Sequence, residues 1–246
     1  MRAHRGRAGA DRTSTSGGAM GVIIPILLFV CLATLVLAAP RLPALREQRR
    51  TRAIGNVLIS CHGFTARPSF TASRIALPGP PFHYGSAQRL TDQVAGTLEG
   101  LPVTSAGYSC RYNGSSHFYG IALVTLPLPV DAAEVRHEPA FHSVRVVEPI
   151  PDSRVQTGVA RFDADYEAYG RDAHHGQSTL SAAGVGELLA APEPFSWRAD
   201  GTQLLLWRSG GWSSAASLLG CVRAASSAVT SSLGNGTGIQ FVRPTR

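Results

Sequence analysis

The sequence contains no lysine and only four cysteines among its 246 residues. All 23 basic residues are arginine, which resembles the codon bias of a GC-rich genome and implies no particular chemistry. The missing lysine excludes a phosphate-binding P-loop. The run Gly-Asn-Gly-Thr-Gly at residues 234–238, which follows a predicted helix and not a strand, is therefore expected to be a helix end and a turn.

The few cysteines exclude two kinds of site. Cys61, Cys110 and Cys221 are widely spaced, odd in number and form no C-x-x-C pair, which argues against both a disulfide framework and a zinc centre. They are expected to be buried free thiols in a reducing compartment. Cys31 lies in an apolar run and is expected to act there as a small apolar residue.

No recognisable nucleophile motif is present. Ser109 lies in Gly-Tyr-Ser-Cys-Arg, which breaks the G-x-S-x-G pattern and falls in a predicted strand. His174 and His175 stand beside Asp172, but adjacent histidines point apart and no further ligand stands at metal spacing. A solvated loop is expected there.

Two other groups of side chains are candidates for binding. Asp163, Asp165 and Glu167 could hold a divalent cation, but the glycine and ligand order of an EF-hand are missing. An exposed polar strand face is expected. The tryptophans are expected to pack the sheet, with a ligand platform or an anchor at the membrane interface as alternatives; they are Trp197, Trp207 and Trp212. The sequence predicts no catalytic residue, cofactor or metal ligand.

The dominant positive feature is an uncharged apolar segment of nineteen residues, 21–39. As a helix it would be roughly 28 Å long, close to the hydrocarbon thickness of a bilayer. We therefore predict a transmembrane helix. A signal peptide cleaved after Val36-Leu37-Ala38 is an alternative, although such segments usually have only about 7–15 apolar residues. A buried core helix is the other alternative.

The basic residues gather beside this segment. Nine arginines and two acids within residues 1–52 account for the whole formal net charge of +7, and the remainder of the chain is neutral. This distribution argues against a nucleic-acid partner, which would need a basic face on the folded domain. It indicates contact of the flanking arginines with the lipid bilayer.

The orientation follows from the arginine density on the two flanks. Five arginines lie within residues 41–52, against four spread over the first twelve residues. Since arginine-rich flanks stay in the cytoplasm, we predict a cytoplasmic C-terminal domain, with an exported domain as the alternative. The glycosylation sequons at Asn113 and Asn235 would then be turns.

Four parts follow from these patterns. Residues 1–20 are expected to be a disordered basic tail, and residues 21–39 the transmembrane helix. Residues 40–84 contain a juxtamembrane helix (45–62) and an irregular connection. Residues 85–246 are expected to form an α+β domain with an antiparallel sheet and two C-terminal helices.

In the juxtamembrane helix, four apolar residues follow the i, i+3, i+4, i+7 spacing that predicts one buried face. They are Ile54, Val57, Leu58 and Cys61. Gly63 is expected to end this helix as a C-cap.

The sheet is predicted from alternation and turn pairs. Strands are expected at residues 87–98, 103–112, 117–126, 134–137, 143–147, 161–168, 195–199 and 202–208. Hairpin turns are expected at Glu99-Gly100, Asn113-Gly114 and Asp200-Gly201, and Pro127 and Pro129 are expected to end the strand before them.

The last two helices are predicted from caps and apolar spacing. Ser178 is expected to cap a helix to residue 191. Ser213 or Ser214 is expected to cap a final helix to about residue 233.

Several short motifs occur along the chain, and their order resembles that of a known family. They are Arg49-Arg50-Thr51-Arg52, Gly-Phe-Thr at 63–65, Pro-Pro-Phe at 80–82, Thr-Leu-Pro-Leu-Pro at 125–129, Val135-Arg136, Phe162 with Tyr166, Phe-Ser-Trp-Arg-Ala-Asp-Gly at 195–201, and Leu-Leu-Leu-Trp at 204–207. The chain resembles a family of actinobacterial membrane-anchored proteins with one N-terminal transmembrane helix and a soluble α+β domain. The resemblance implies the anchor and the fold. No activity is established for that family, so it assigns no functional residues.

The resulting hypothesis is a non-enzymatic interaction or scaffold module tethered to the membrane. It depends on an anchor joined to a charge-balanced domain. The alternatives are a membrane-tethered enzyme of unknown class, such as a hydrolase, and the same domain exported from the cell.

Overall fold

The structure, a computed structural model, describes residues 42–68, 81–82, 85–137, 153–170 and 180–233. The chain divides into two units, Met1–Pro43 and Ala44–Arg246. The predicted tail and transmembrane segment, residues 1–39, lie outside the described residues. Within the described ranges, no helix has both the length and the apolar character needed to cross a bilayer.

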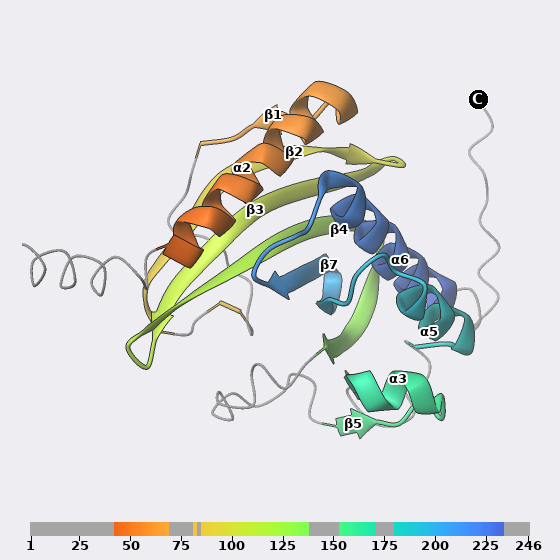
Figure 1. Cartoon of the computed structure of the whole chain (residues 1–246). Helices are drawn as coiled ribbons and strands as arrows, with labels where there is room; N and C mark the ends of the chain where they lie inside the picture. The colour runs from red at the N-terminus through yellow and green to blue at the C-terminus, as the bar shows by residue number, and fades with distance from the viewer. Residues whose placement is uncertain (1–41, 69–80, 83–84, 138–152, 171–179, 234–246) are drawn as a thin grey trace, which may run out of the picture. The chain divides into compact units, whose positions relative to one another are not determined.

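The second unit is an α+β domain with an antiparallel sheet, as predicted (Figure 1). Its elements are α2 (Leu42–His62), β1 (Thr65–Ala66), β2 (Ser86–Leu98), β3 (Leu101–Tyr112), β4 (Ser115–His137), β5 (Ser153–Val155), α3 (Ala160–Asp165), β6 (Tyr166–Gly170), α5 (Ala182–Leu189), β7 (Ser196–Ser209) and α6 (Ala215–Leu233). The described strands form one seven-stranded sheet in the order β1-β2-β3-β4-β6-β5, with β7 paired to β4. The long strand β4 pairs on one edge with β3 and, further along, with β6. Its other edge pairs with β7.

Two of the predicted hairpin turns are confirmed. Glu99 and Gly100 join β2 to β3 with φ of +53° and +84°, and Asn113 and Gly114 join β3 to β4 with φ of +49° and +77°. Two successive residues with positive φ form the turn whose twist matches that of the flanking strands. These two turns set the register of the β2–β3–β4 meander.

Strand β4 continues well beyond its predicted end. The expectation that Pro127 and Pro129 end it is wrong, because β4 runs on to His137. Pairing between β4 and β7 is interrupted over residues 126–129. The prolines therefore lie where no ladder hydrogen bond requires an N–H group. The strand predicted at 134–137 is the end of β4, and 143–147 lies outside the described residues.

The predicted hairpin at Asp200-Gly201 is wrong as well. β7 is one strand from Ser196 to Ser209. Gly201 has a φ of +57° and pairs with Val130 inside the irregular stretch of β4. The positive φ thus forms a bulge opposite the irregularity in β4, and both strands continue together.

The strand predicted over residues 161–168 is wrong in its first half. Residues Ala160–Asp165 form helix α3, and β6 begins only at Tyr166. Phe162 and Tyr166 are buried and stack with ring centroids 4.7 Å apart. A spacing of four residues places two side chains on one side of a helix as well as of a strand, so the alternation is ambiguous here.

Helix α2 packs on the sheet through a different face from the predicted one. Ile54 and Leu58 are buried as expected, but Val57 is 43% exposed and Cys61 is exposed. The neighbours that face inward are Thr51 and Gly55. A Cβ atom on Gly55 would lie 3.4 Å from Val94 on β2, which is an ordinary van der Waals distance.

The end of α2 follows the prediction. Gly63 has a φ of +71°, and the backbone N–H of Phe64 donates to the carbonyl oxygen of Leu58 at 3.2 Å. This is the bond of a helix end closed by a left-handed glycine. The chain then turns into β1, a short strand in a region predicted to be irregular.

Helices α5 and α6 are the two predicted C-terminal helices. α5 is shorter than the predicted range 178–191, and its N-cap is Ser181, which accepts from the N–H of Gly184 at 3.1 Å. Ser178 lies outside the described residues. Ser214 caps α6 as expected, accepting from the N–H of Ser217 at 3.0 Å.

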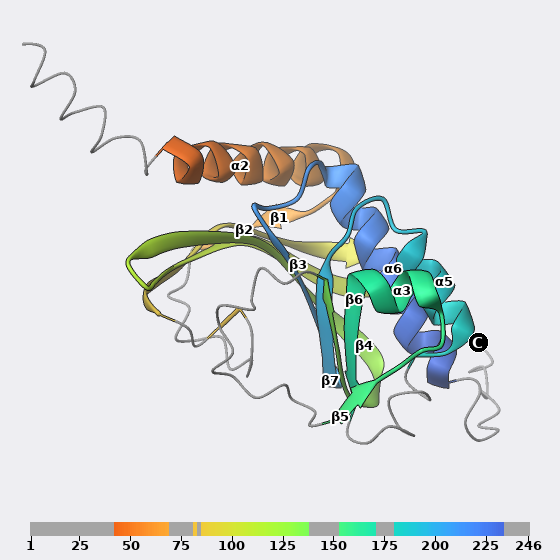
Figure 2. The same cartoon turned by 60° about the horizontal axis from the view of Figure 1, so that its bottom comes forward.

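The helices lie on one face of the sheet (Figures 1 and 2). The helix-side core fills the space between them and the sheet, and includes Leu58, Trp197 and Trp212. The opposite face carries a second apolar cluster: Phe82, Leu90, Ala106, Tyr108, Cys110, Tyr119, Ile121, Leu205 and Trp207. Of the described helices, none lies over this second cluster.

Candidate functional site

Two of the predicted candidate sites cannot be placed. His174, His175 and Asp172 lie outside the described residues, as does the glycine-rich run at 234–238. The expectations of a solvated loop and of a helix end therefore stay predictions.

The acidic candidates do not share one strand face. Asp163 lies on α3, where its carboxylate accepts from the N–H and hydroxyl of Thr157 at 3.1 and 2.9 Å and from the N–H of Gly158 at 3.0 Å. Glu167 lies on β6, accepts from Tyr169 Oη at 2.8 Å and pairs with Arg154 at 3.6 Å. Both carboxylates thus hold local structure. In the described part of the chain, no group of side chains could hold a metal ion.

Ser109 lies within β3, as predicted. It pairs with Arg89 on β2 and with Phe118 on β4, so it occupies the middle of a ladder. The serine of a G-x-S-x-G motif stands on an exposed strand–helix turn, and this position does not provide one.

The cysteines differ in exposure. Cys110 and Cys221 are buried free thiols as predicted, whereas Cys61 is exposed, which corrects the prediction for that residue. Burial raises the pKa of Cys221 to about 12 and also raises the pKa of Cys110. Because the thiolate is the nucleophile, the two buried cysteines are unreactive in the folded domain.

The three tryptophans are buried, which confirms that they pack the sheet. Trp197 and Trp212 belong to the helix-side core and Trp207 to the second cluster. Side chains divided between two faces cannot form one ligand platform. Trp212 lies directly on Gly120 of β4, where an added Cβ would be 2.6 Å from the indole ring.

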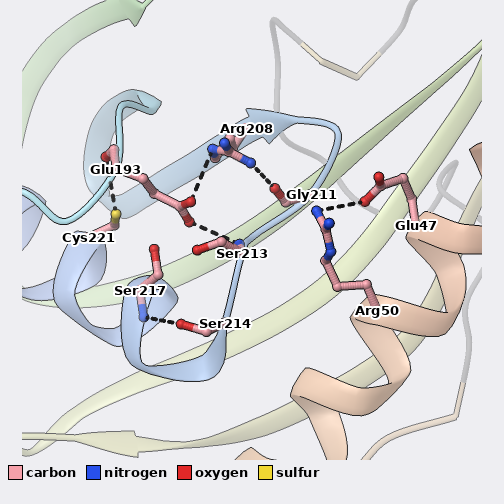
Figure 3. A network of polar contacts seen from close by, with 9 residues as sticks. All are labelled: Glu47, Arg50, Glu193, Arg208, Gly211, Ser213, Ser214, Ser217 and Cys221. Carbon is pink, nitrogen blue, oxygen red and sulfur yellow. Dashed lines mark hydrogen bonds and ion pairs between the residues drawn. The ribbon is translucent and has the colours of Figure 1, made fainter.

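A polar network joins the start of α6 to the end of β7 (Figure 3). The carboxylate of Glu193 accepts from the N–H of Ser213 at 3.2 Å and pairs with Arg208 Nε at 3.4 Å. The other end of Arg208 donates to the carbonyl oxygen of Gly211, and Cys221 Sγ lies 3.5 Å from the carbonyl oxygen of Glu193. This negative group near the beginning of α6 also complements the helix dipole.

The network links the segment before β7, the end of β7 and the start of α6. It leaves few polar groups that could act on a substrate. The side chain of Glu193 is only 8% exposed, and its two oxygens already have partners. Its residues come from three different segments of the chain, and sequence reasoning singled out only Ser213 and Cys221 among them. We interpret it as a structural brace.

A second group of charges lies on the sheet near the bulge, on the face opposite the helix-side core. Glu134 is fully buried and accepts from Arg136 Nε, and it pairs across the strands with Arg198, itself only 4% exposed. Arg136 also stacks over the ring of Tyr169 at 5.1 Å. Burial raises the pKa of the Glu134 carboxyl, although both arginines oppose the shift. Arg198 also pairs with the carboxylate of Asp200 at 3.6 Å. Two arginines and two acids therefore balance here, so this group does not favour a ligand of either charge.

The outward face of α2 is the remaining candidate surface. Four large hydrophobic side chains are exposed among the described residues, and three of them lie on this helix: Leu45 at 50%, Val57 at 43% and Ile59 at 38%. Arg46 and Arg49 are exposed there and form no ion pair with the part of the chain that is described. Exposed apolar side chains and unpaired arginines are two of the features of a helix that meets a membrane surface.

Comparison with known proteins adds little. No protein-family model and no curated protein matches the chain. Among solved structures, it is similar to the crystal structure of the mycobacterial trehalose monomycolate transport factor A, TtfA, with 12% sequence identity and a TM-score of 0.49 over 73% of this chain and 90% of that one. A similarity of this size supports no conclusion about function, and the resemblance to actinobacterial membrane-anchored proteins stays a prediction.

Proposed function

We propose that the protein is a single-pass membrane protein whose α+β domain serves as a non-enzymatic interaction module at the bilayer surface. The observation that carries the proposal is the position of α2. This helix begins at Leu42, directly after the apolar segment 21–39, and its residues Ile54 and Leu58 are part of the helix-side core. The helix next to the anchor is thus an integral part of the folded domain.

The short connection limits how far the domain can stand from the membrane. Residues 40 and 41 separate the apolar segment from α2. A fully extended chain spans at most about 3.5 Å per residue, so the connection reaches on the order of 10 Å. If residues 21–39 cross the bilayer, the start of α2 therefore lies within the headgroup layer.

The cytoplasmic orientation is tested with the chain's own exposed thiol. In a Cys31→Ser variant, Cys61 is the exposed cysteine of the described domain, because Cys110 and Cys221 are buried. We expect a membrane-impermeant maleimide to label Cys61 only after the cells are permeabilised. Labelling in intact cells would instead support the exported domain.

The interaction role is tested by cross-linking in membranes before detergent extraction. The control is a Leu28→Arg, Val30→Arg variant, because each arginine in the middle of a span opposes insertion by about 3 kcal/mol. We expect the anchored chain to recover a specific partner and the control to lose it. Recovery of no specific protein by the anchored chain, or of the same proteins by both chains, contradicts the role.

A further inference from the structure

We propose that the outward face of α2 docks on an anionic lipid surface, so that the helix lies along the bilayer and holds the domain in one orientation. The proposal rests on the membrane anchoring proposed above and adds the contact surface and its partner. Figure 2 shows α2 on the outside of the sheet, with no described element beyond it.

The exposed apolar side chains are spread along the length of α2, which is the first observation that supports the proposal. Leu45 stands near the beginning of α2 and Ile59 near its end, and Val57 projects from the opposite flank of the outward face. Fourteen residues of helix separate Leu45 from Ile59, a rise of about 21 Å. An upright helix would bring only its first turn to the membrane. A helix that lies flat brings Leu45 to the interface and leaves Val57 and Ile59 on its two flanks, because side chains two positions apart point about 160° away from each other.

The charges on the same face carry the second step. Arg46 and Arg49 are exposed, and the side chain of Arg52 is 67% exposed although it pairs with Asp92 at 2.9 Å. The acid of α2, Glu47, is only 20% exposed and pairs with Arg50. The outward face is therefore basic, which complements the negative surface potential of a bilayer with anionic lipids.

The sequence around the junction permits the required change of direction. Pro40 follows the apolar segment, and Pro43 is the second residue of α2. Proline disfavours a helical conformation in the residue before it, yet it is well tolerated in a first helical turn. The pair therefore does not favour one continuous helix from the apolar segment into α2, and the docked orientation requires such a break.

The test measures how close the outward face lies to lipid in the full chain. Asn56, at the centre of the face and exposed, is changed to Cys in a Cys31→Ser, Cys61→Ser background and labelled with a fluorophore. The chain is placed in nanodiscs of phosphatidylglycerol and phosphatidylcholine, or of phosphatidylcholine alone, with lipids brominated near the headgroup as quenchers. Glu187→Cys on α5, also exposed, is the matched control.

We expect strong quenching at position 56 in anionic discs, weaker quenching in neutral discs and none at position 187. Changing Arg46 and Arg49 to Gln should lower the ratio of docked to undocked chains about fivefold for each arginine. Equal quenching at positions 56 and 187, or quenching that ignores lipid charge and both arginines, overturns the docking proposal. A chain that fails to enter the discs refutes the anchoring instead, so the two failures are distinguishable.

Discussion

The contact between Gly120 and Trp212 predicts a sharp response to one added methyl group. In Gly120→Ala the new Cβ would lie 2.6 Å from Cδ1 and 2.8 Å from Nε1 of the Trp212 indole, and 2.9 Å from its backbone nitrogen. Trp212 is only 2% exposed, so neither the ring nor the backbone has free space to move into. Overpacking of this kind costs typically about 1–3 kcal/mol.

The measurement is urea denaturation of the full chain in detergent, followed by tryptophan fluorescence. A double-mutant cycle isolates the clash with the ring, because in a Trp212→Ala background the part of the cost of Gly120→Ala that comes from the indole should disappear. The contact with the backbone nitrogen of residue 212 remains in that background. Gly186 is the matched control. It lies on α5 with open space around its Cα, and Gly186→Ala should stabilise the domain by about 0.5–1 kcal/mol. Gly120→Ala as stable as the unchanged chain, or a cost that is the same with and without the indole, refutes the packing described here.

The remaining predictions concern buried groups. In the native Cys31→Ser chain, a thiol reagent should modify Cys61 quickly and Cys221 only after denaturation, as mass spectrometry of peptides would show. Burial raises the pKa of both Cys221 and Tyr166 to about 12, so the folded chain retains protons that the unfolded chain loses above pH 9 and 10. Stability should therefore fall as the pH rises from about 9 toward 12, by about 1.4 kcal/mol per pH unit for each group, and less steeply in Cys221→Ala. Glu193→Ala should cost about 1–3 kcal/mol in denaturant titrations because it leaves the N–H of Ser213 and the guanidinium of Arg208 without their acceptor. Glu193→Gln, which keeps an acceptor for that N–H, should cost less.

Local turn chemistry made part of the fold predictable. Asn113-Gly114 and Glu99-Gly100 adopt positive φ at both positions, and the strands beside them pair as expected. Asp200-Gly201 carries the same local signal but lies inside a continuous strand. The difference is non-local, because β4 has its own irregular stretch opposite Gly201, and no dipeptide records what lies across the sheet.

The inward face of α2 shows a second limit of sequence reasoning. Ile54 and Leu58 fit both the predicted face and the observed one, so the apolar spacing alone left the rotation of the helix open. In the structure it is Gly55, a residue without an apolar side chain, that lies against Val94. The resulting exposure of Val57 could not be foreseen from hydropathy, and it is one basis of the proposed lipid contact.

The buried charged pair on the sheet could not be predicted without the register of the strands. Glu134 and Arg198 are 64 positions apart in the chain, and they become neighbours only because β4 pairs with β7 beyond the bulge. Since the sequence predicted neither the length of β4 nor the continuity of β7, it could not predict this buried pair. Ser214, by contrast, caps α6 through a bond to a residue three positions away, which a local pattern can indicate.

The claim that the domain is held at a membrane by residues 21–39 is tested most directly by flotation after an alkaline wash. Membranes from cells that produce the full chain, or its Leu28→Arg, Val30→Arg variant, are washed with carbonate and floated through a density gradient. The full chain should rise with the lipid, and the variant should stay at the bottom as a folded, soluble domain. Release of the full chain by the wash, or flotation of both chains alike, would contradict the proposed anchor.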